Sequence, residues 1–449
     1  MEVDKLSFKR KALITLIAFL FIFNVPFRFL PFATGKIFTL WSIFILCYFL
    51  HKKKHLLFIN NRTVKYFFFF SFLLFYYSFM VAILKETYDF TLAYAYFLFF
   101  FEYLLGGVVL TYYLSKYRCL TLINLLKVFV WMSFIQAIII FLMLLIPSLK
   151  DLIYSLLRAD IRESIMSVNE RYGGIRGAGL AASVTYDLSI IQPFALVFIN
   201  SFYFKLEKNS SKIKYIIMYL IILLSVFVSG RTGWLGIGFS LYLLFAFPLI
   251  PKKIRFIFNM KHFKKRVGFL SRLLGMILIL VLISFIFLSN DFIELITEKA
   301  FPFAFEMFIN YYEEGKFETT SSNVVQKMII RIPSDALLFG HGLFYNSQGG
   351  YYMHTDIGYI RHILFYGMVG SLLLYSFYIW LFRNIYIKTR FLYDKRLQQV
   401  ILILGLYAFI AHIKGDFLVG AAAPVKMFFL IFLIIGNEFK NKLNLFNNE

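Results

Sequence analysis

The stretch LINLLKVFVWMSFIQAIIIFLMLLI, residues 122–146, decides the fold class. It carries one charged side chain, Lys127, near its start. A helix that spans a membrane needs about 20 predominantly apolar residues, and backbone inside lipid must satisfy its own hydrogen bonds. The stretch therefore predicts a transmembrane helix.

Similar blocks recur along the whole chain of 449 residues, which is 60% hydrophobic and only 16% charged. A soluble domain cannot hide that much apolar surface. The short alternating segments of a membrane β-barrel do not occur. We predict an all-α, polytopic membrane protein with a single transmembrane domain over residues 1–449 and about twelve helices. The predicted helices cover residues 12–30, 36–50, 64–84, 90–114, 122–146, 188–204, 214–229, 233–250, 270–289, 357–382, 398–413 and 424–437. Asn24 and Pro26 favour an early end or a kink in the first of them.

Lysine and arginine indicate the orientation of these helices. With the N-terminus inside the cell, the inner segments hold 31 of the 47 basic residues but only 6 of the 24 acidic ones. Cytoplasmic loops are enriched in Lys and Arg. We therefore expect both termini in the cytoplasm. The formal net charge of +23 is then mainly a topology signal, aided by anionic lipid, and does not indicate a nucleic-acid partner.

Two large loops are expected on the outer side, at residues 147–187 and 290–356. The second contains apolar stretches at 301–309 and 329–339. Such stretches are typical of interfacial or re-entrant helices that lie on the membrane. Other connections are short, so chemistry is most readily placed in these two loops and beside them.

No motif indicates a metal or a cofactor. Cys47 falls in an apolar block and Cys119 in a short basic loop, so neither predicts a disulfide or a metal site. A phosphate-cradling Walker motif and a zinc-protease motif are both absent from the sequence, which argues against ATP-driven transport.

The first candidate site is the run ERYGGIRGAG at residues 170–179. Arg171 and Arg176 stand among four glycines, which let the backbone approach a ligand closely. The guanidinium fork matches phosphate oxygens. The alternative is a flexible surface loop with solvated charges.

A second candidate, Arg231, lies in the short turn SGRTG at residues 229–233. Its position suits a phosphate group at the membrane surface. The alternative is an arginine that snorkels to anchor a helix end.

The richest segment is HTDIGYIRH, residues 354–362, which opens a predicted helix. Asp356 and Arg361 are costly to bring into a membrane unless they pair or bind a ligand. His354 and Asp356 both suit proton transfer. The alternative is an ordinary helix start with Asp356 near the positive end of the helix dipole.

Further candidates flank this segment. Tyr359 lies within it, and His341 precedes it between two glycines. The small residues of YGMVG, residues 366–370, favour close helix packing. Lys414 and Asp416, in HIKGD at residues 412–416, either form a local ion pair of small energetic effect or complete a charged cavity.

These residues fit a lipid-linked diphosphate as substrate. Arginines on one membrane face would stabilise the developing charge of a diphosphate leaving group. They would take the place of the metal that nucleotide-dependent enzymes use. A base such as His354 or Asp356 would take the proton from an attacking sugar hydroxyl.

The order of motifs resembles that of the O-antigen and capsule repeat-unit polymerases. Ser-Gly-Arg-Thr-Gly at 229–233 is followed by a large outer loop and then by Asp356-x-Gly-Tyr-x-Arg361, which leads into a helix with Tyr-Gly-x-x-Gly. Arg171-x-x-Gly174 and Lys414 also fit, and the similarity of layout covers most of the chain.

The resemblance implies an all-helical membrane glycosyltransferase, of the GT-C-like architecture, in the bacterial cytoplasmic membrane. It implies transfer of a growing glycan from undecaprenyl diphosphate onto the next lipid-linked repeat unit, with a chain-length regulator and a flippase as further partners. The diphosphate or glycan contacts implied are Arg171, Arg176, Arg231 and Arg361, with His354 and Asp356 beside them.

Two alternatives stay open. The related O-antigen ligases carry a His at the end of their large outer loop, a place that His354 could fill, and they pass the glycan to lipid A–core. A flippase or transporter of lipid-linked glycan is the alternative from another class. Transporters tend to show repeated halves and broken helices at the midplane, and the sequence shows neither.

Overall fold

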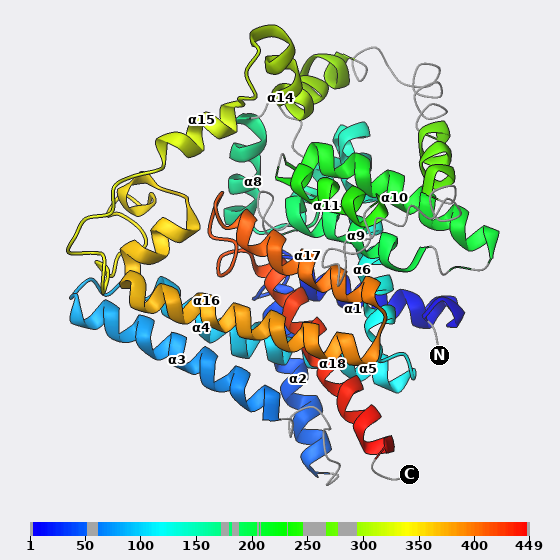
Figure 1. The fold of residues 1–449 in the computed structure, drawn as a ribbon, viewed down its shortest axis with the longest axis horizontal. Coiled ribbons are helices and arrows are strands. Elements are labelled where there is room, and N and C mark those ends of the chain that lie inside the picture. The colour runs from blue at the N-terminus through cyan, green and yellow to red at the C-terminus, as the bar shows by residue number, and fades with distance from the viewer. Residues whose placement is uncertain are drawn as a thin grey trace, which may run out of the picture.

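The computed structural model describes residues 3–51, 62–171, 179–181, 188–203, 206, 208–230, 232–245, 266–276 and 294–446. Within these ranges the chain is helical, and its only β-type pairings are two isolated bridges. The all-α fold class is therefore confirmed (Figure 1).

The α-helices are α1 Phe8–Phe23, α2 Thr34–His51, α3 Arg62–Leu84, α4 Thr91–Leu98, α5 Leu105–Lys116, α6 Leu122–Leu145, α7 Pro147–Ser155, α8 Ala159–Arg171, α9 Ser189–Phe202, α10 Asn209–Ser229, α11 Gly233–Phe245, α14 Phe301–Glu314, α15 Thr320–Lys327, α16 Gly358–Leu392, α17 Lys395–Ala411 and α18 Ala422–Phe446. Two π-helical segments, η2 Phe99–Leu104 and η5 Leu295–Ala300, and two short 3₁₀ turns, η1 Val3–Lys5 and η6 Tyr352–His354, join these helices, and residues 266–276 are also helical. The predicted helix 270–289 lies largely outside the described residues.

Six of the described helices are long and apolar enough to cross a membrane. They are Val64–Leu84, Thr91–Lys116, Leu122–Leu145, Asn209–Ser229, Gly358–Leu392 and Ala422–Leu443. Three shorter apolar helices, Thr34–Phe49, Ser189–Phe202 and Gly233–Leu244, add to them. A membrane protein is thus indicated, while twelve spans stay a prediction.

The first helix ends early, as Asn24 and Pro26 predicted. Asn24 is the C-cap of α1 in the left-handed conformation, with φ 49° and ψ 49°. Its side chain then accepts a hydrogen bond of 2.7 Å from the backbone N–H of Gly35, near the start of α2. The cap therefore ends one helix and positions the next.

The two large loops contain more helix than the sequence predicted. Residues 147–155 and 159–171 form α7 and α8, and the apolar stretch 301–309 lies within the helix α14. The stretch 329–339 is not a helix but a series of turns, so that expectation is wrong. Pro333 lacks the N–H that a helix needs there, and Gly340 adopts a positive φ of 71°.

A buried ion pair ties the middle of the bundle together. Glu102 lies in the π-helical segment between α4 and α5, and its Oε1 is 2.7 Å from Nζ of Lys426 on α18. The side chains are 5% and 0% exposed. Gly35 leaves room for this ion pair, because a Cβ added to it would lie 2.3 Å from Glu102 Oε1. Charges in such a place persist only when paired.

The N-terminus is fixed by a second charge cluster. The carboxylate of Asp4 lies 2.9 Å from Lys127 Nζ on α6 and 3.0 Å from Lys214 Nζ on α10, and it accepts a hydrogen bond from Tyr215 Oη. Burial opposes the charged form, but the hydrogen bond and charge of Lys127 dominate together with Lys214, and they lower the pKa of Asp4 to about 2.

Helix α16 runs between α3 and α17 and also packs on α18 (Figure 1). It is kinked at Tyr366 and Gly367, where Gly367 has φ 70° and ψ −171°. A Cβ on Gly367 would lie 2.1 Å from Leu338 O, so only glycine fits. The predicted role of close packing belongs to Gly370, whose missing Cβ makes room for Tyr77 of α3.

Loop residues 337–342 pair with the backbone that the kink opens. The N–H groups of His341 and Gly342 donate to Leu364 O and Phe365 O at 2.6 and 2.8 Å, and Met368 N–H donates to Leu337 O at 2.8 Å. Backbone groups that lose helical partners in a membrane protein must find others. The turns at 329–342 thus hold the first two turns of α16 in place.

Candidate functional site

Arg361 lies on the first turns of α16, before the kink, and is only 5% exposed. Its Nη1 is 3.5 Å from Oδ1 of Asp356, whose side chain is 19% exposed. The structure therefore brings together the two charged residues of the segment 354–362 as an ion pair.

Aromatic rings enclose the guanidinium of Arg361. Its Cζ lies 3.7 Å from the centre of the Phe344 ring and 3.9 Å from that of Tyr351. Tyr345 adds a third ring at 5.8 Å. We call Arg361, Asp356, Phe344, Tyr345 and Tyr351 the Arg361 cluster. Cation–π contacts hold the guanidinium plane without using its N–H groups.

The turn between α3 and α4 positions these rings. Asp89 accepts a hydrogen bond of 2.7 Å from Phe344 N–H, and Thr87 Oγ1 donates to Gly342 O at 2.7 Å. Asp89 also caps its own turn through Thr91 N–H at 3.0 Å. The loop segment that carries Phe344 and Tyr345 is therefore anchored to the turn between α3 and α4.

Two nitrogens of the Arg361 guanidinium lack hydrogen-bond partners. Nε and Nη2 are buried and have no hydrogen-bond partner among the described residues. Buried polar groups in folded proteins are nearly always paired, so such atoms call for a ligand, a water or an ion. A buried guanidinium with open donors is suited to an oxyanion.

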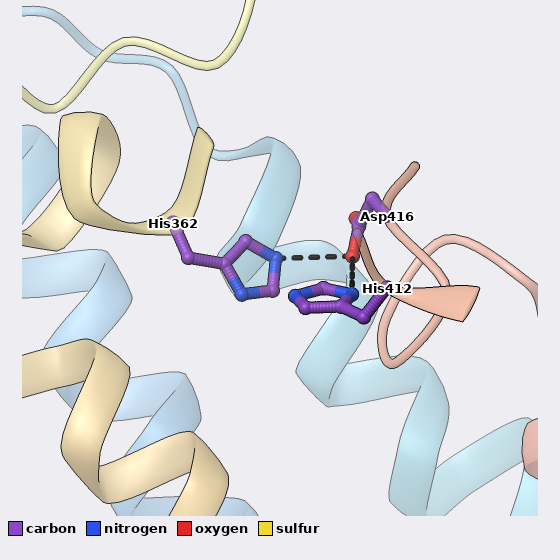
Figure 2. Close-up of side chains that lie close together, drawn as sticks. All are labelled: His362, His412 and Asp416. Atoms are coloured by element: carbon purple, nitrogen blue, oxygen red, sulfur yellow. Dashed lines mark hydrogen bonds and ion pairs between the residues drawn. The ribbon is translucent and has the colours of Figure 1, made fainter. Parts of the chain in front are cut away.

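A second group lies beside it, formed by His362, His412 and Asp416, which we call the His–Asp network (Figure 2). His362 Nε2 is 3.0 Å from Asp416 Oδ1, and His412 Nδ1 is 4.0 Å from the same oxygen. All three residues are buried. Figure 2 shows both imidazoles directed toward this single carboxylate oxygen.

Backbone contacts fix the members of the His–Asp network. Val419 N–H donates to Asp416 Oδ1 at 3.3 Å, and Phe417 N–H donates to His412 Nδ1 at 3.1 Å. Gly358 N–H donates to His412 O at 3.0 Å, which joins the start of α16 to the end of α17. A Cβ on Gly358 would lie 2.3 Å from the His412 ring.

The network is electrostatically linked to Arg361. Burial alone would raise the pKa of the Asp416 carboxyl, but the charge and hydrogen bond of His362, with smaller effects of His412 and Arg361, lower it. Asp416 is therefore a carboxylate stabilised by neighbours on two helices. Burial also raises the pKa of Tyr351 in the Arg361 cluster.

Three polar atoms near Arg361 also lack hydrogen-bond partners among the described residues. They are His362 Nδ1, His412 Nε2 and Tyr375 Oη, and all three atoms are buried. The Tyr375 ring stacks on His362 with centroids 6.5 Å apart and meets His412 at 6.0 Å. Together with Arg361, they concentrate unpaired donors and acceptors in one region.

The His–Asp network also contains the ligand types of a transition-metal site. The candidate ligand atoms of the three residues lie within 4.8 Å of one another. However, His412 Nδ1 already accepts N–H bonds from Phe417 and Leu418, at 3.1 and 3.4 Å. Its lone pair is therefore engaged, and a metal would have to displace both bonds. The geometry favours a hydrogen-bond network over metal ligation.

The other predicted site residues are more scattered. Tyr359 Oη donates to Phe409 O at 2.9 Å, and its ring meets His412 at 4.7 Å. Lys414 is half-buried in the turn with Asp416. His341 bonds Asp335 at 2.9 Å and Tyr352 Oη at 3.0 Å, on the loop that holds the α16 kink.

His354 is exposed, two residues before Asp356, with a positive φ of 56°. Arg171 is the last residue of α8, and its side chain lies outside the described part of the chain. Arg176 and Arg231 lie outside the described part entirely. The structure thus brings together Asp356, Tyr359, Arg361 and Asp416, and leaves the three other arginines as predictions.

The sequence predicted neither His362 nor His412 as a site residue. Both stand inside the quoted segments, next to Arg361 and two residues before Lys414. The sequence feature that could have identified them is their position at otherwise apolar helix ends. Burying a polar residue there costs free energy unless the residue has a partner. An apolar groove of about 840 Å³ lies elsewhere, between α2, α3 and η2, and Lys65 is the one charged residue among its described lining residues.

Comparisons of the chain with protein-family models, with curated proteins and with solved structures find no match.

Proposed function

We propose that this chain is a membrane glycosyltransferase that polymerises lipid-linked oligosaccharide repeat units into O-antigen or capsular polysaccharide. The growing glycan passes from undecaprenyl diphosphate to the next lipid-linked unit, at the outer face of the bacterial cytoplasmic membrane. A flippase would supply the units and a chain-length regulator would limit the product.

The observation that carries the proposal is that Arg361 is buried with unpartnered hydrogen-bond donors. It is a buried cation whose Nε and Nη2 have no partner among the described residues. Burying an unpaired charged donor is costly unless a ligand restores the lost interactions. A diphosphate offers both negative charge and several acceptor oxygens, so it matches the open N–H groups.

The surroundings of Arg361 favour binding of a diphosphate leaving group over binding of an anion that does not react. Phe344 and Tyr351 hold the guanidinium plane, so its N–H groups are oriented before a substrate binds. Oriented donors stabilise charge that develops as the glycosidic bond to the diphosphate breaks. Arg171, Arg176 and Arg231 are proposed as further diphosphate or glycan contacts, and His354 and Asp356 as groups at the reacting end.

The test is the length of the glycan on cells that carry Arg361→Ala in place of the wild-type chain. Arg331→Ala is the matched control, because Arg331 is an exposed arginine of the large loop that precedes α16. We expect single repeat units on lipid A–core for the Arg361 variant and full polymer for the control. Loss of one oriented donor lowers turnover by roughly 100- to 1,000-fold.

Analysis of lipid-linked intermediates in a deletion strain separates the three functions. Single units transferred to lipid A–core support a polymerase. Polymer stranded on the lipid carrier would instead indicate a ligase. Units trapped on the inner leaflet would indicate a flippase, and full-length polymer in the Arg361 variant would remove Arg361 from the site.

A further inference from the structure

A glycosyl transfer needs a group that accepts the proton of the attacking hydroxyl, and the two expected candidates are poorly placed for it. Asp356 is engaged with Arg361 at 3.5 Å. His354 is exposed to solvent on a loop. The described residues beside Arg361 offer another acceptor.

Protons in the His–Asp network can be assigned from its hydrogen bonds. His362 Nε2 faces the Asp416 carboxylate at 3.0 Å, so Nε2 carries the proton and donates it. When this ring is neutral, its lone pair is on Nδ1. This Nδ1 is buried and has no hydrogen-bond partner among the described residues.

His412 is excluded from the same role by its own contacts. Its Nδ1 accepts hydrogen bonds from Phe417 N–H and Leu418 N–H at 3.1 and 3.4 Å. The proton of the neutral ring is therefore on Nε2, so both nitrogens are committed, one as an acceptor and the other as a donor. His412 can orient a hydroxyl by donating to it but cannot take its proton.

The contacts of Asp416 suit a carboxylate that stabilises an imidazolium on His362. It is 5% exposed, its Oδ1 is fixed by Val419 N–H at 3.3 Å, and His362 lies within hydrogen-bond distance. A carboxylate bonded to the far nitrogen of a histidine fixes the tautomer and stabilises the charged ring after proton uptake. His362 follows Arg361 directly on α16, so the kink that positions one positions the other.

We propose that His362 is the proton acceptor for the attacking sugar hydroxyl and that Asp416 is its positioning residue. The inference rests on the proposed function. The hydroxyl oxygen forms the new bond to the anomeric carbon of the donor glycan. The bond from that carbon to the diphosphate oxygen breaks, and the electron pair leaves with undecaprenyl diphosphate. The hydroxyl proton moves to His362 Nδ1. Because this atom is enclosed, binding of the acceptor must part the side chains that cover it.

The kinetic test uses the purified full-length chain in lipid nanodiscs. The probe is the lipid-linked repeat unit extracted from cells that lack this protein. We expect His362→Gln and Asp416→Asn to lower kcat by roughly 100- to 10,000-fold while KM changes little. His51→Gln is the matched control, since His51 is an exposed histidine at the end of α2, and it should keep the wild-type kcat.

A spectroscopic test needs no variant to be active. Nitrogen-15 spectra of histidine-labelled wild-type protein should include a ring signal with unprotonated Nδ1 and protonated Nε2 that is absent from the spectra of His362→Gln. A protonated Nδ1 on His362 would overturn the proposal. So would one equivalent of zinc bound to the purified wild-type chain and lost in His362→Gln, because the metal would occupy the lone pairs.

Two outcomes distinguish the role of His362 from the proposed function. If Arg361→Ala loses transfer while folded His362→Gln keeps the wild-type kcat, the proton acceptor is wrong and the proposed function stands. If Arg361→Ala keeps full transfer, the proposed function loses its main support.

Discussion

Gly367 is the position where a single methyl group should disrupt both the fold and the site. In Gly367→Ala, the added Cβ would lie 2.1 Å from Leu338 O, and the residue would have to keep φ 70° and ψ −171°. Only glycine adopts this region readily, and forcing another residue into it costs of order 1–3 kcal/mol.

The steric conflict adds to the backbone strain. To clear Leu338 O, the loop must move away from α16, which weakens the bonds from Met368 N–H to Leu337 O and from Val369 N–H to Leu338 O, now 2.8 and 3.4 Å. Each such bond contributes about 1 kcal/mol. We therefore expect Gly367→Ala to lose about 2–5 kcal/mol of stability.

The assay is thermal unfolding of the purified chain in detergent, followed by glycan chain length in cells. Gly238→Ala is the matched control, because a Cβ at this helical glycine of α11 meets no atom of the described residues within 4 Å. Alanine there should be neutral or stabilising by up to about 1 kcal/mol. Wild-type stability and full-length polymer in Gly367→Ala would refute the role assigned to the kink.

Two further predictions concern the charge clusters. Glu102→Gln should destabilise the chain by about 3–5 kcal/mol because it leaves Lys426 buried without its counter-charge, and the double variant Glu102→Leu/Lys426→Met should recover most of that loss in thermal unfolding. A double variant as unstable as the single one would contradict this. Asp4 has a pKa lowered from 3.8 to about 2 in the folded chain, so it stabilises the fold above about pH 4, and this contribution of about 2 kcal/mol is lost as the pH falls toward 2. Asp4→Asn should flatten the dependence of unfolding on pH in that window, and an unchanged slope would count against the cluster.

Local patterns were enough to predict much of the architecture. Apolar block length located most ends of the long apolar helices to within a few residues, and the early end favoured by Asn24 is the end that α1 has. Helix α16 continues to Leu392, ten residues beyond its predicted end, because the basic residues after 382 continue the helix past the apolar block. Composition indicates where lipid begins but not where a helix stops.

Part of the site could be predicted because its members are neighbours in sequence. Asp356 and Arg361 lie five residues apart at the start of one helix, and they form an ion pair. Asp416 was also predicted, but its partner His362 is 54 residues away on another helix. Only the packing of α16 on α17 brings the two together.

The kink and the aromatic enclosure could not be read from the chain alone. The run Tyr366–Gly370 predicted close packing, which holds for Gly370, while Gly367 serves a bend that requires Leu338 to lie against it. Phe344 encloses Arg361 only because Asp89, on a distant turn, holds its backbone. Such contacts depend on tertiary neighbours, which local periodicity does not encode.

The central claim is that Arg361 binds the diphosphate of a lipid-linked glycan that this chain elongates. Its most direct test is to incubate the purified chain alone, in lipid nanodiscs, with the extracted lipid-linked repeat unit and to measure the number of repeats on the lipid. We expect a ladder of two or more repeats with the wild-type chain and with Arg331→Ala, and single units only with Arg361→Ala. Single units from the wild-type chain, or an equal ladder from Arg361→Ala, would contradict it.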